Sequence, residues 1–171
     1  DKPWIVHGSD AGIVAGWEID ATDLGDIQVN LAWRTDAANN GNQGLYSLEG
    51  GNSFAVAMGQ LDDDDNLEMV VGSGSGKVHV FDGKTYESEW VSNPLEKTPI
   101  GIAIGDLNDD GVNEIVVTTA NPDEPKTGGE GGEGYLYIFE KDGDGFTQVV
   151  KSDDMGAALS VVISELDGTT Y

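Results

Sequence analysis

Short apolar runs recur along the chain, and clusters of Gly, Asp and Asn separate them. This punctuation is typical of strands and turns, because an amphipathic helix would instead repeat its apolar positions about every 3.6 residues. We therefore expect an all-β fold with almost no helix. The predicted strands are Trp4–His7, Gly12–Ile19, Val29–Trp33, Phe54–Gly59, Glu68–Gly72, Lys77–Phe81, Glu87–Val91, Ile100–Gly105, Asn113–Thr118, Gly134–Phe139, Phe146–Lys151 and Leu159–Ser164.

The chain contains an internal repeat. Ala55–Val71 aligns without gaps to Gly101–Val117, which lies 46 positions further on. Met69–Asp82 resembles Ile5–Glu18 in the same way, and Val161–Thr170 matches the start of the repeat. A complete repeat spans four predicted strands, so we interpret each repeat as one supersecondary unit.

A four-strand repeat of this length predicts β-propeller blades, whose strands we label A to D outward from the axis. The first residues match strand B and the last match strand A, which gives about three blades, whereas propellers close with about four to eight. We expect a fragment of a larger propeller, or an assembly completed by neighbouring chains. Within a single propeller segment, 1–171, the predicted parts are a partial blade with an insertion at 1–52, a blade at 53–98, a blade at 99–155 with a loop insertion at 121–134, and the start of the next blade at 156–171.

One turn carries candidate metal chemistry. Asp106–Glu114 joins two predicted strands and has oxygen-bearing side chains at its positions one, three, five and nine, with Gly111 at position six. Calcium prefers about six to eight hard oxygen ligands, and glycine permits the sharp bend that lets alternate side chains point inward. An EF-hand is excluded because position twelve is Val117, inside an apolar strand, and not Glu. The predicted ligands are the side chains of Asp106, Asn108, Asp110 and Glu114 and the carbonyl of Val112.

Two further turns repeat parts of this pattern. In the second turn Gln60 replaces the first Asp and Asp65 replaces the glycine, so a missing charge and a stiffer bend should weaken calcium binding. The third turn has an incomplete ligand set. Asp, Asn and Gly also suit hydrogen-bonded β-turns that hold no metal, and this alternative stays open for all three turns. The candidate ligands are Gln60, Asp62, Asp64, Asn66 and Glu68 in the second turn, and Glu165, Asp167 and Thr169 in the third.

These turns resemble the FG-GAP repeat of integrin-α-type β-propellers, whose motif is Asp-x-Asn/Asp-x-Asp-Gly-x-x-Asp between strands A and B. The resemblance covers roughly Phe54–Ser152, and Glu114 stands in place of the usual final Asp. It implies that the turns bind Ca²⁺ as a structural ion. It also implies a module for recognition or adhesion that is extracellular or at the cell surface.

The charge is the outlier of the composition, since 32 Asp and Glu residues against 8 Lys and Arg give a formal net charge of −24. This argues against nucleic acid as a partner, because phosphate neutralisation needs clustered Lys and Arg. Two calcium ions would add four positive charges and leave −20, so most of the acidity has another cause. A salt-rich habitat, in which salt screens the self-repulsion of an acidic surface, is one hypothesis. No apolar run reaches about 18 residues, so we expect no direct membrane insertion.

No catalytic constellation stands out. The two histidines, His7 and His79, occupy non-equivalent repeat positions in predicted strands, and we assign them ordinary strand roles. Outside the turns, no spacing singles out the paired carboxylates that glycoside hydrolysis requires. Trp17 matches Phe81 in the repeat, which favours packing between blades over sugar stacking. We therefore predict that the protein is not an enzyme.

Three function classes remain. The leading one is a non-catalytic extracellular recognition, adhesion or surface-structure module that binds a protein or a glycan. The second is a self-assembling fibre or surface-layer subunit whose copies form a homo-oligomer or filament, because an unpaired strand at an incomplete repeat invites pairing with another chain. The third is an accessory domain of a secreted carbohydrate-active enzyme.

Overall fold

A computed structural model describes residues 3–9, 13–21, 27–34, 55–121, 132–158 and 160–164. As predicted, this part of the chain is all-β, with eleven strands and no helix. No helix long and apolar enough to span a membrane occurs in these ranges. The strands are β1 (Trp4–Gly8), β2 (Val14–Ala21), β3 (Ile27–Arg34), β4 (Ala55–Gly59), β5 (Glu68–Gly72), β6 (Val78–Phe81), β7 (Ser88–Val91), β8 (Thr98–Gly105), β9 (Glu114–Ala120), β10 (Leu136–Asp142) and β11 (Gly145–Lys151).

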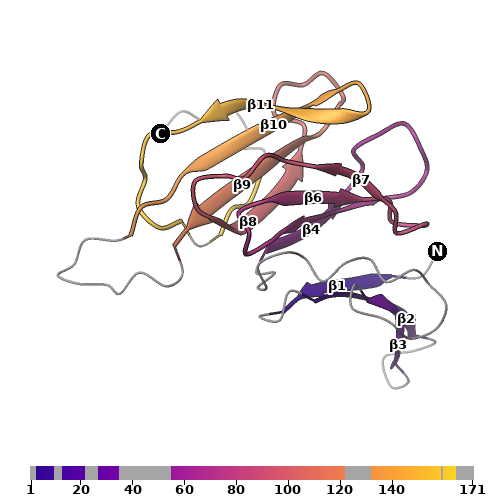
Figure 1. Ribbon diagram of the computed structural model, residues 1–171. Helices are drawn as coiled ribbons and strands as arrows, with labels where there is room; N and C mark the ends of the chain where they lie inside the picture. Colours follow the sequence, from indigo (N-terminus) through magenta and orange to yellow (C-terminus); the bar gives the residue numbers. More distant parts are fainter. Residues whose placement is uncertain are drawn as a thin grey trace.

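The strands form three antiparallel sheets (Figure 1). The N-terminal sheet has the order β1-β2-β3, the middle sheet β4-β5-β6-β7 and the C-terminal sheet β8-β9-β10-β11. Each sheet is therefore a meander of consecutive strands, and the middle and C-terminal sheets each contain the four strands of one repeat. Within the described ranges no sheet closes on itself.

Strand β5 shows why the sheets stack. All of its residues are buried, although an exposed sheet would leave every second side chain in water. Met69 and Val71 lie in a hydrophobic core that includes Val14 of the N-terminal sheet. Val70, which stands between them, lies in a second core shared with the C-terminal sheet. Since successive side chains of a strand point to opposite faces, both faces of the middle sheet are covered.

The larger core lies between the middle and C-terminal sheets. Trp90 of β7 packs against it, with its ring centroid 5.5 Å from that of Phe139 and 5.4 Å from that of Phe146, both in edge-to-face geometry. Each aliphatic side chain fully buried here contributes about 1.5–3 kcal/mol relative to exposure, so this core is a main source of cohesion between the two sheets. Its buried members are Ala55, Leu61, Val70, Val78, Val80, Ile102, Ile115, Val117, Tyr137, Phe139 and Phe146.

Glycines in the first strand of each four-stranded sheet allow close approach of the next unit. A Cβ atom at Gly59 of β4 would lie 2.7 Å from Cγ2 of Ile104 in β8. The contact recurs one repeat later, where a Cβ atom at Gly105 would lie 3.1 Å from Cγ2 of Ile163. Ile104 and Ile163 occupy equivalent repeat positions. The segment 160–164 therefore contacts β8 through the same residue pair by which β8 contacts β4.

Eleven of the twelve predicted strands are observed, with ends shifted by at most three residues. The exception is Leu159–Ser164, because its described residues, 160–164, form no ladder with any described strand. Strands β10 and β11 form a hairpin, and Gly143 in its turn has a φ of 60°. Residues 35–53 and 122–131 of the predicted insertions lie outside the described ranges. So do Glu165, Asp167 and Thr169, the third candidate ligand set.

Candidate metal sites

Each of the two described acidic turns connects the first strand of a four-stranded sheet to the second strand of the same sheet, and the two sheets are adjacent. The first turn, Asp106–Glu114, follows β8 and ends in the first residue of β9. The second turn, Gln60–Glu68, follows β4 and ends in the first residue of β5. A hydrogen bond of 2.8 Å from Asn113 Nδ2 to the carbonyl oxygen of Gln60 joins them. The two turns therefore lie side by side at one end of the stacked sheets.

The first turn folds around its own side-chain oxygens. Asp106 Oδ1 accepts hydrogen bonds from the backbone N–H groups of Asn108 at 3.2 Å and Asp110 at 3.3 Å, and its Oδ2 accepts from Gly111 at 2.8 Å. Asn108 Oδ1 accepts from the N–H of Asp110 at 3.0 Å, and Asp110 Oδ1 accepts from the N–H of Val112 at 2.8 Å. Bonds to backbone N–H groups of the same turn hold these three side chains against the turn, and Asn108 and Asp110 stay exposed to solvent.

Two residues with positive φ give the first turn its tight bend. Asp109 has a φ of 61° and Gly111 a φ of 87°. Glycine adopts this conformation without steric cost, and Asp tolerates it better than most residues. No residue of the second turn has a positive φ, including Asp65 at the position equivalent to Gly111. The backbones of the two turns therefore follow different paths, and weaker calcium binding by the second turn stays a prediction.

Glu114 closes the first turn from inside the sheet. Its side chain is buried, its Oε2 accepts a 2.7 Å hydrogen bond from the N–H of Leu107, and its Oε1 accepts a 3.5 Å bond from Asn108 Nδ2. Hydrogen bonds, above all from the N–H of Gly111, lower the pKa of Asp106 below its usual value, despite a small opposing effect of burial. Asp106 is therefore ionised at neutral pH.

The residues of the first turn fit a calcium ion in the chemistry of their donors. Asp106, Asn108, Asp110 and Glu114 offer only hard oxygen ligands, which calcium prefers. A carboxylate has about four lone-pair sites, so an oxygen that accepts one N–H can still bind a cation. The carboxylate oxygens of this turn do not all lie within 4.8 Å of one another, however. Within the described ranges, one other set of three acidic residues does meet this distance.

The second turn is stabilised by a different set of bonds. Gln60 Nε2 donates to the carbonyl oxygen of Asp64, and Gln60 Oε1 accepts from the N–H of Asp62 at 3.2 Å. Asp64 accepts from both the N–H and the side-chain Nδ2 of Asn66, at 2.5 and 2.8 Å. The position that carries the Asp106 carboxylate in the first turn thus holds an amide that donates into the turn. A donating amide there is less favourable to a cation than a carboxylate.

Glu68, at the end of the second turn, is a buried acidic residue with an unsatisfied oxygen. Only 1% of its surface is exposed. Its Oε2 accepts a 2.5 Å hydrogen bond from the N–H of Leu61, which repeats the contact of Glu114 with Leu107. Its Oε1 is buried and has no hydrogen-bond partner. Burial, with a smaller contribution from the charge of Asp62, raises the pKa of Glu68 to about 7, against a weaker lowering effect of the Leu61 bond.

Glu68 shares its surroundings with two other acids. One oxygen each of Asp62, Glu68 and Glu89 lie within 4.8 Å of one another. We call these three residues the acidic triad. Burial, followed by the charge of Asp62, raises the pKa of Glu89, and the positive charge of Lys141 only partly opposes this. The triad therefore concentrates like charge at a partly desolvated point.

Sequence reasoning assigned two triad residues to the second turn and missed Glu89. Asp62 and Glu68 belong to the repeated motif, whereas Glu89 lies on β7, which is separated from β5 by β6. Nothing in the local sequence marks Glu89, because its role depends on how the strands are paired across the sheet. Asp64 and Asn66, which were also predicted as ligands, bond to each other and are not part of the triad.

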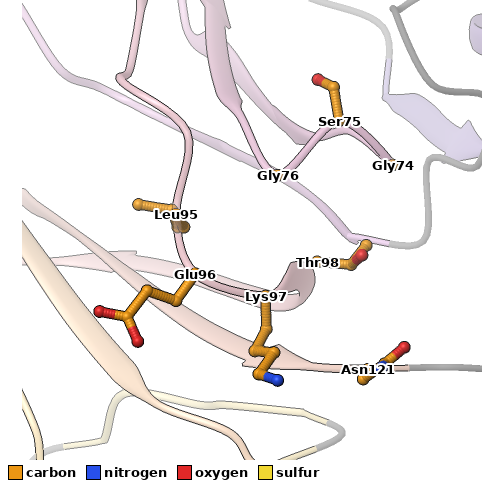
Figure 2. A pocket seen from close by; sticks show the side chains of 8 residues that line it. All are labelled: Gly74, Ser75, Gly76, Leu95, Glu96, Lys97, Thr98 and Asn121. Atoms are coloured by element: carbon orange, nitrogen blue, oxygen red, sulfur yellow. The ribbon is translucent and has the colours of Figure 1, made fainter. Parts of the chain in front are cut away.

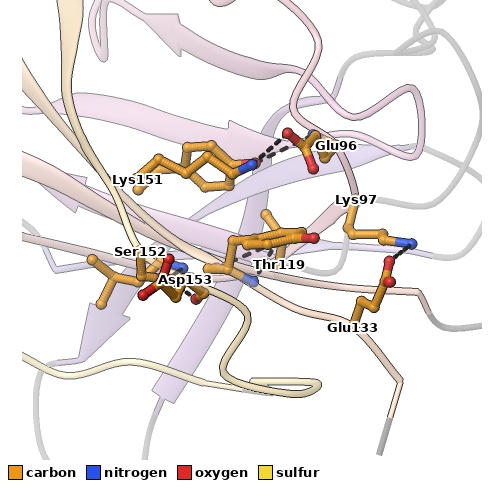
Figure 3. A network of polar contacts seen from close by, with 10 residues as sticks. Glu96, Lys97, Thr119, Glu133, Lys151, Ser152 and Asp153 are labelled. Carbon is orange, nitrogen blue, oxygen red and sulfur yellow. Dashed lines mark hydrogen bonds and ion pairs between the residues drawn. The ribbon is translucent and has the colours of Figure 1, made fainter.

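A separate pocket of about 280 Å³ lies where the middle and C-terminal sheets meet, away from the turns (Figure 2). It is lined by Gly74–Gly76, residues 95–98 and Asn121. Figure 3 shows that the lysines beside it are engaged with acids: Lys97 Nζ lies 2.8 Å from Glu133 Oε2, and Lys151 pairs with Glu96. Because these ion pairs hold the connection between β7 and β8 against the C-terminal sheet, we interpret this region as a structural junction.

No protein-family model matches the chain, and no curated protein matches it. The likeness to FG-GAP repeats therefore rests on the motif residues of the two turns and on the order of the strands around them.

Proposed function

We propose that this chain is a non-catalytic recognition or adhesion module of the cell exterior, built from propeller-type blades and stabilised by calcium in the first turn. The observation that carries the proposal is that the side chains of Asp106, Asn108 and Asp110 fold back onto the backbone of one tight turn, which ends at the buried Glu114. All four offer hard oxygen, and the pattern is the one that calcium-binding turns use.

The ion would act on stability. Three of these side chains are carboxylates, and a divalent ion would draw their oxygens together and offset the repulsion between them. Because the turn joins β8 to the buried strand β9, a cation held there would fix the start of a strand whose Ile115 and Val117 lie in the core between the middle and C-terminal sheets. We expect the partner surface to lie elsewhere and to bind a protein or a glycan.

A calcium titration by calorimetry measures how many ions each chain binds and so tests the metal-binding part of this proposal. Asp110→Asn should remove one bound ion per chain, because it deletes a charged ligand from the first turn. Asp109→Asn is the matched control, since it removes the same charge from the neighbouring position, is exposed, and keeps a residue that tolerates positive φ. Unchanged calcium binding by Asp110→Asn would refute the assignment.

A second candidate function, self-assembly, is favoured by the contact of Ile163 with Gly105. The segment 160–164 sits on β8 as the first strand of a further unit would, and one edge of β1 has no neighbouring strand in the described chain. Pairing of 160–164 of one copy with β1 of another would complete a four-stranded sheet between chains.

The repeat specifies the register of that pairing. Ala57 of β4 lies opposite Val70 of β5, and the equivalent residues are Val162 and Val6. The chain has no cysteine, so a Val6→Cys and Val162→Cys variant should form disulfide-linked oligomers on oxidation. The control is Ile5→Cys with Val162→Cys, because neighbouring side chains of a strand face opposite sides. Equal cross-linking by both variants, or a strictly monomeric wild-type protein in sedimentation, would exclude this assembly.

A further inference from the structure

The acidic triad has the dimensions of a cation site. Two ligands on opposite sides of a calcium ion are about 4.6–5.2 Å apart, since calcium–oxygen distances are about 2.3–2.6 Å. The three triad oxygens lie within 4.8 Å of one another, so a single ion can contact all of them. Water can supply the remaining ligands, because Glu89 is exposed and Asp62 is only half-buried.

The buried oxygen of Glu68 needs a partner that the described chain does not supply. Its Oε1 is inaccessible and accepts no hydrogen bond, although its Oε2 is satisfied by Leu61. Leaving a buried polar atom unsatisfied is costly, and a charged one more so. The corresponding oxygen of Glu114 has a partner in Asn108 Nδ2. The unsatisfied atom is therefore specific to the triad and is not a general property of the motif.

We propose that Asp62, Glu68 and Glu89 bind a divalent cation, calcium, at a site built across the middle sheet and not within the second turn. This site rests on the proposed function only in its choice of ion. It takes one ligand from the turn after β4, one from the start of β5 and one from β7. A cation there would fasten the outer strand β7 to the turn, a connection that no turn-only site provides.

The surrounding charges agree with this assignment. The positive charge of Lys141 only partly opposes the raised pKa of Glu89, and the Lys141 nitrogen lies 5.0 Å from the ring centroid of Phe146, so the aromatic ring also engages it. Ligands that are all carboxylates favour calcium, magnesium or manganese over zinc or copper, which prefer imidazole or thiolate. Calcium is preferred to magnesium here because the ligands come from three separate segments, and calcium tolerates irregular geometry.

The test uses the full chain and calorimetric titration with calcium chloride after treatment with a chelator. The background carries Asp110→Asn, so the first turn does not contribute. In this background one ion per chain should still bind. Adding Glu89→Gln should weaken its binding about tenfold or more, because one of three charged ligands is lost. Adding Glu87→Gln, which removes an exposed carboxylate outside the triad, should leave the affinity unchanged.

Two results would overturn the proposal. One is equal calcium affinity with and without Glu89→Gln. The other is loss of binding with Asp64→Asn but not with Glu89→Gln, which would assign the ion to the second turn itself. Failure of the proposed function would give a different result, because wild type and Asp110→Asn would then bind the same number of calcium ions. Glu89 is exposed, so Glu89→Gln should fold normally, and its thermal melting in chelator verifies this.

Discussion

Replacing Glu68 by Gln should remove much of the pH dependence of stability in metal-free protein. Burial raises the pKa of Glu68 from 4.5 to about 7. A carboxyl group whose pKa is higher in the folded state favours folding while it is protonated, so its contribution is lost as pH rises from about 4.5 to about 7. Between pH 4 and pH 8 ionisation of this one group should lower the free energy of unfolding by about 3 kcal/mol.

The assay is chemical denaturation at a series of pH values with a chelator present. Glu68→Gln keeps an oxygen that can accept the hydrogen bond of Leu61 but cannot ionise, so its stability should fall less than that of wild type over this pH range. Carboxylates outside the acidic triad contribute equally to both proteins and cancel in the difference. Glu87→Gln, at an exposed site, should behave as wild type. If Glu68→Gln loses as much stability as wild type, the burial argument is wrong. Saturating calcium should reduce the wild-type loss, because a cation favours the ionised form.

Three further predictions concern the turns, the sheet contacts and the charge. Gly111→Ala should destabilise the protein by about 1–2 kcal/mol, since a Cβ atom meets nothing within 4 Å there and only the positive φ opposes it; a Tm equal to wild type would contradict this. Gly59→Ala should lower the free energy of unfolding by about 1–3 kcal/mol through overlap with Ile104. In a double-mutant cycle Ile104→Ala should recover part of that loss. Strictly additive effects would argue against direct contact. With calcium held saturating, the Tm should rise between low and molar salt because screening relieves the repulsion of a net charge of −24; no rise would rule out the salt-rich habitat hypothesis.

The strands were predictable because their signals are local. In β5 and β9 the continuous apolar runs that follow Glu68 and Glu114 reflect burial on both faces, and the flanking Asp and Gly residues mark the turns. The repeat then indicated which strands belong to one sheet. The segment 160–164 was the exception, since a strand also needs a partner to form a ladder, and sequence similarity alone does not provide one.

The candidate sites were only partly predictable. The hydrogen bonds from the first turn's backbone to its own side-chain oxygens follow from spacing within nine residues, and the sequence specifies that spacing directly. The acidic triad depends on β7 lying two strands away from β5, so Glu89 could not be found without the sheet order. The divergence of the second turn could be anticipated from Gln60 and Asp65, but the unsatisfied oxygen of Glu68 could not, because it depends on burial.

The paired contacts of Ile104 with Gly59 and of Ile163 with Gly105 have a consequence for how such a protein can change in length. The middle and C-terminal sheets each present a bare glycine to an isoleucine of the segment that follows, and Met58 takes the place of that isoleucine in the middle sheet itself. Duplication or deletion of one whole unit therefore joins surfaces that already match. A gene encoding this fold could gain or lose whole units by recombination, of 46 codons between the first two copies of the acidic turn and 59 between the second and third, without any compensating change at the new junction.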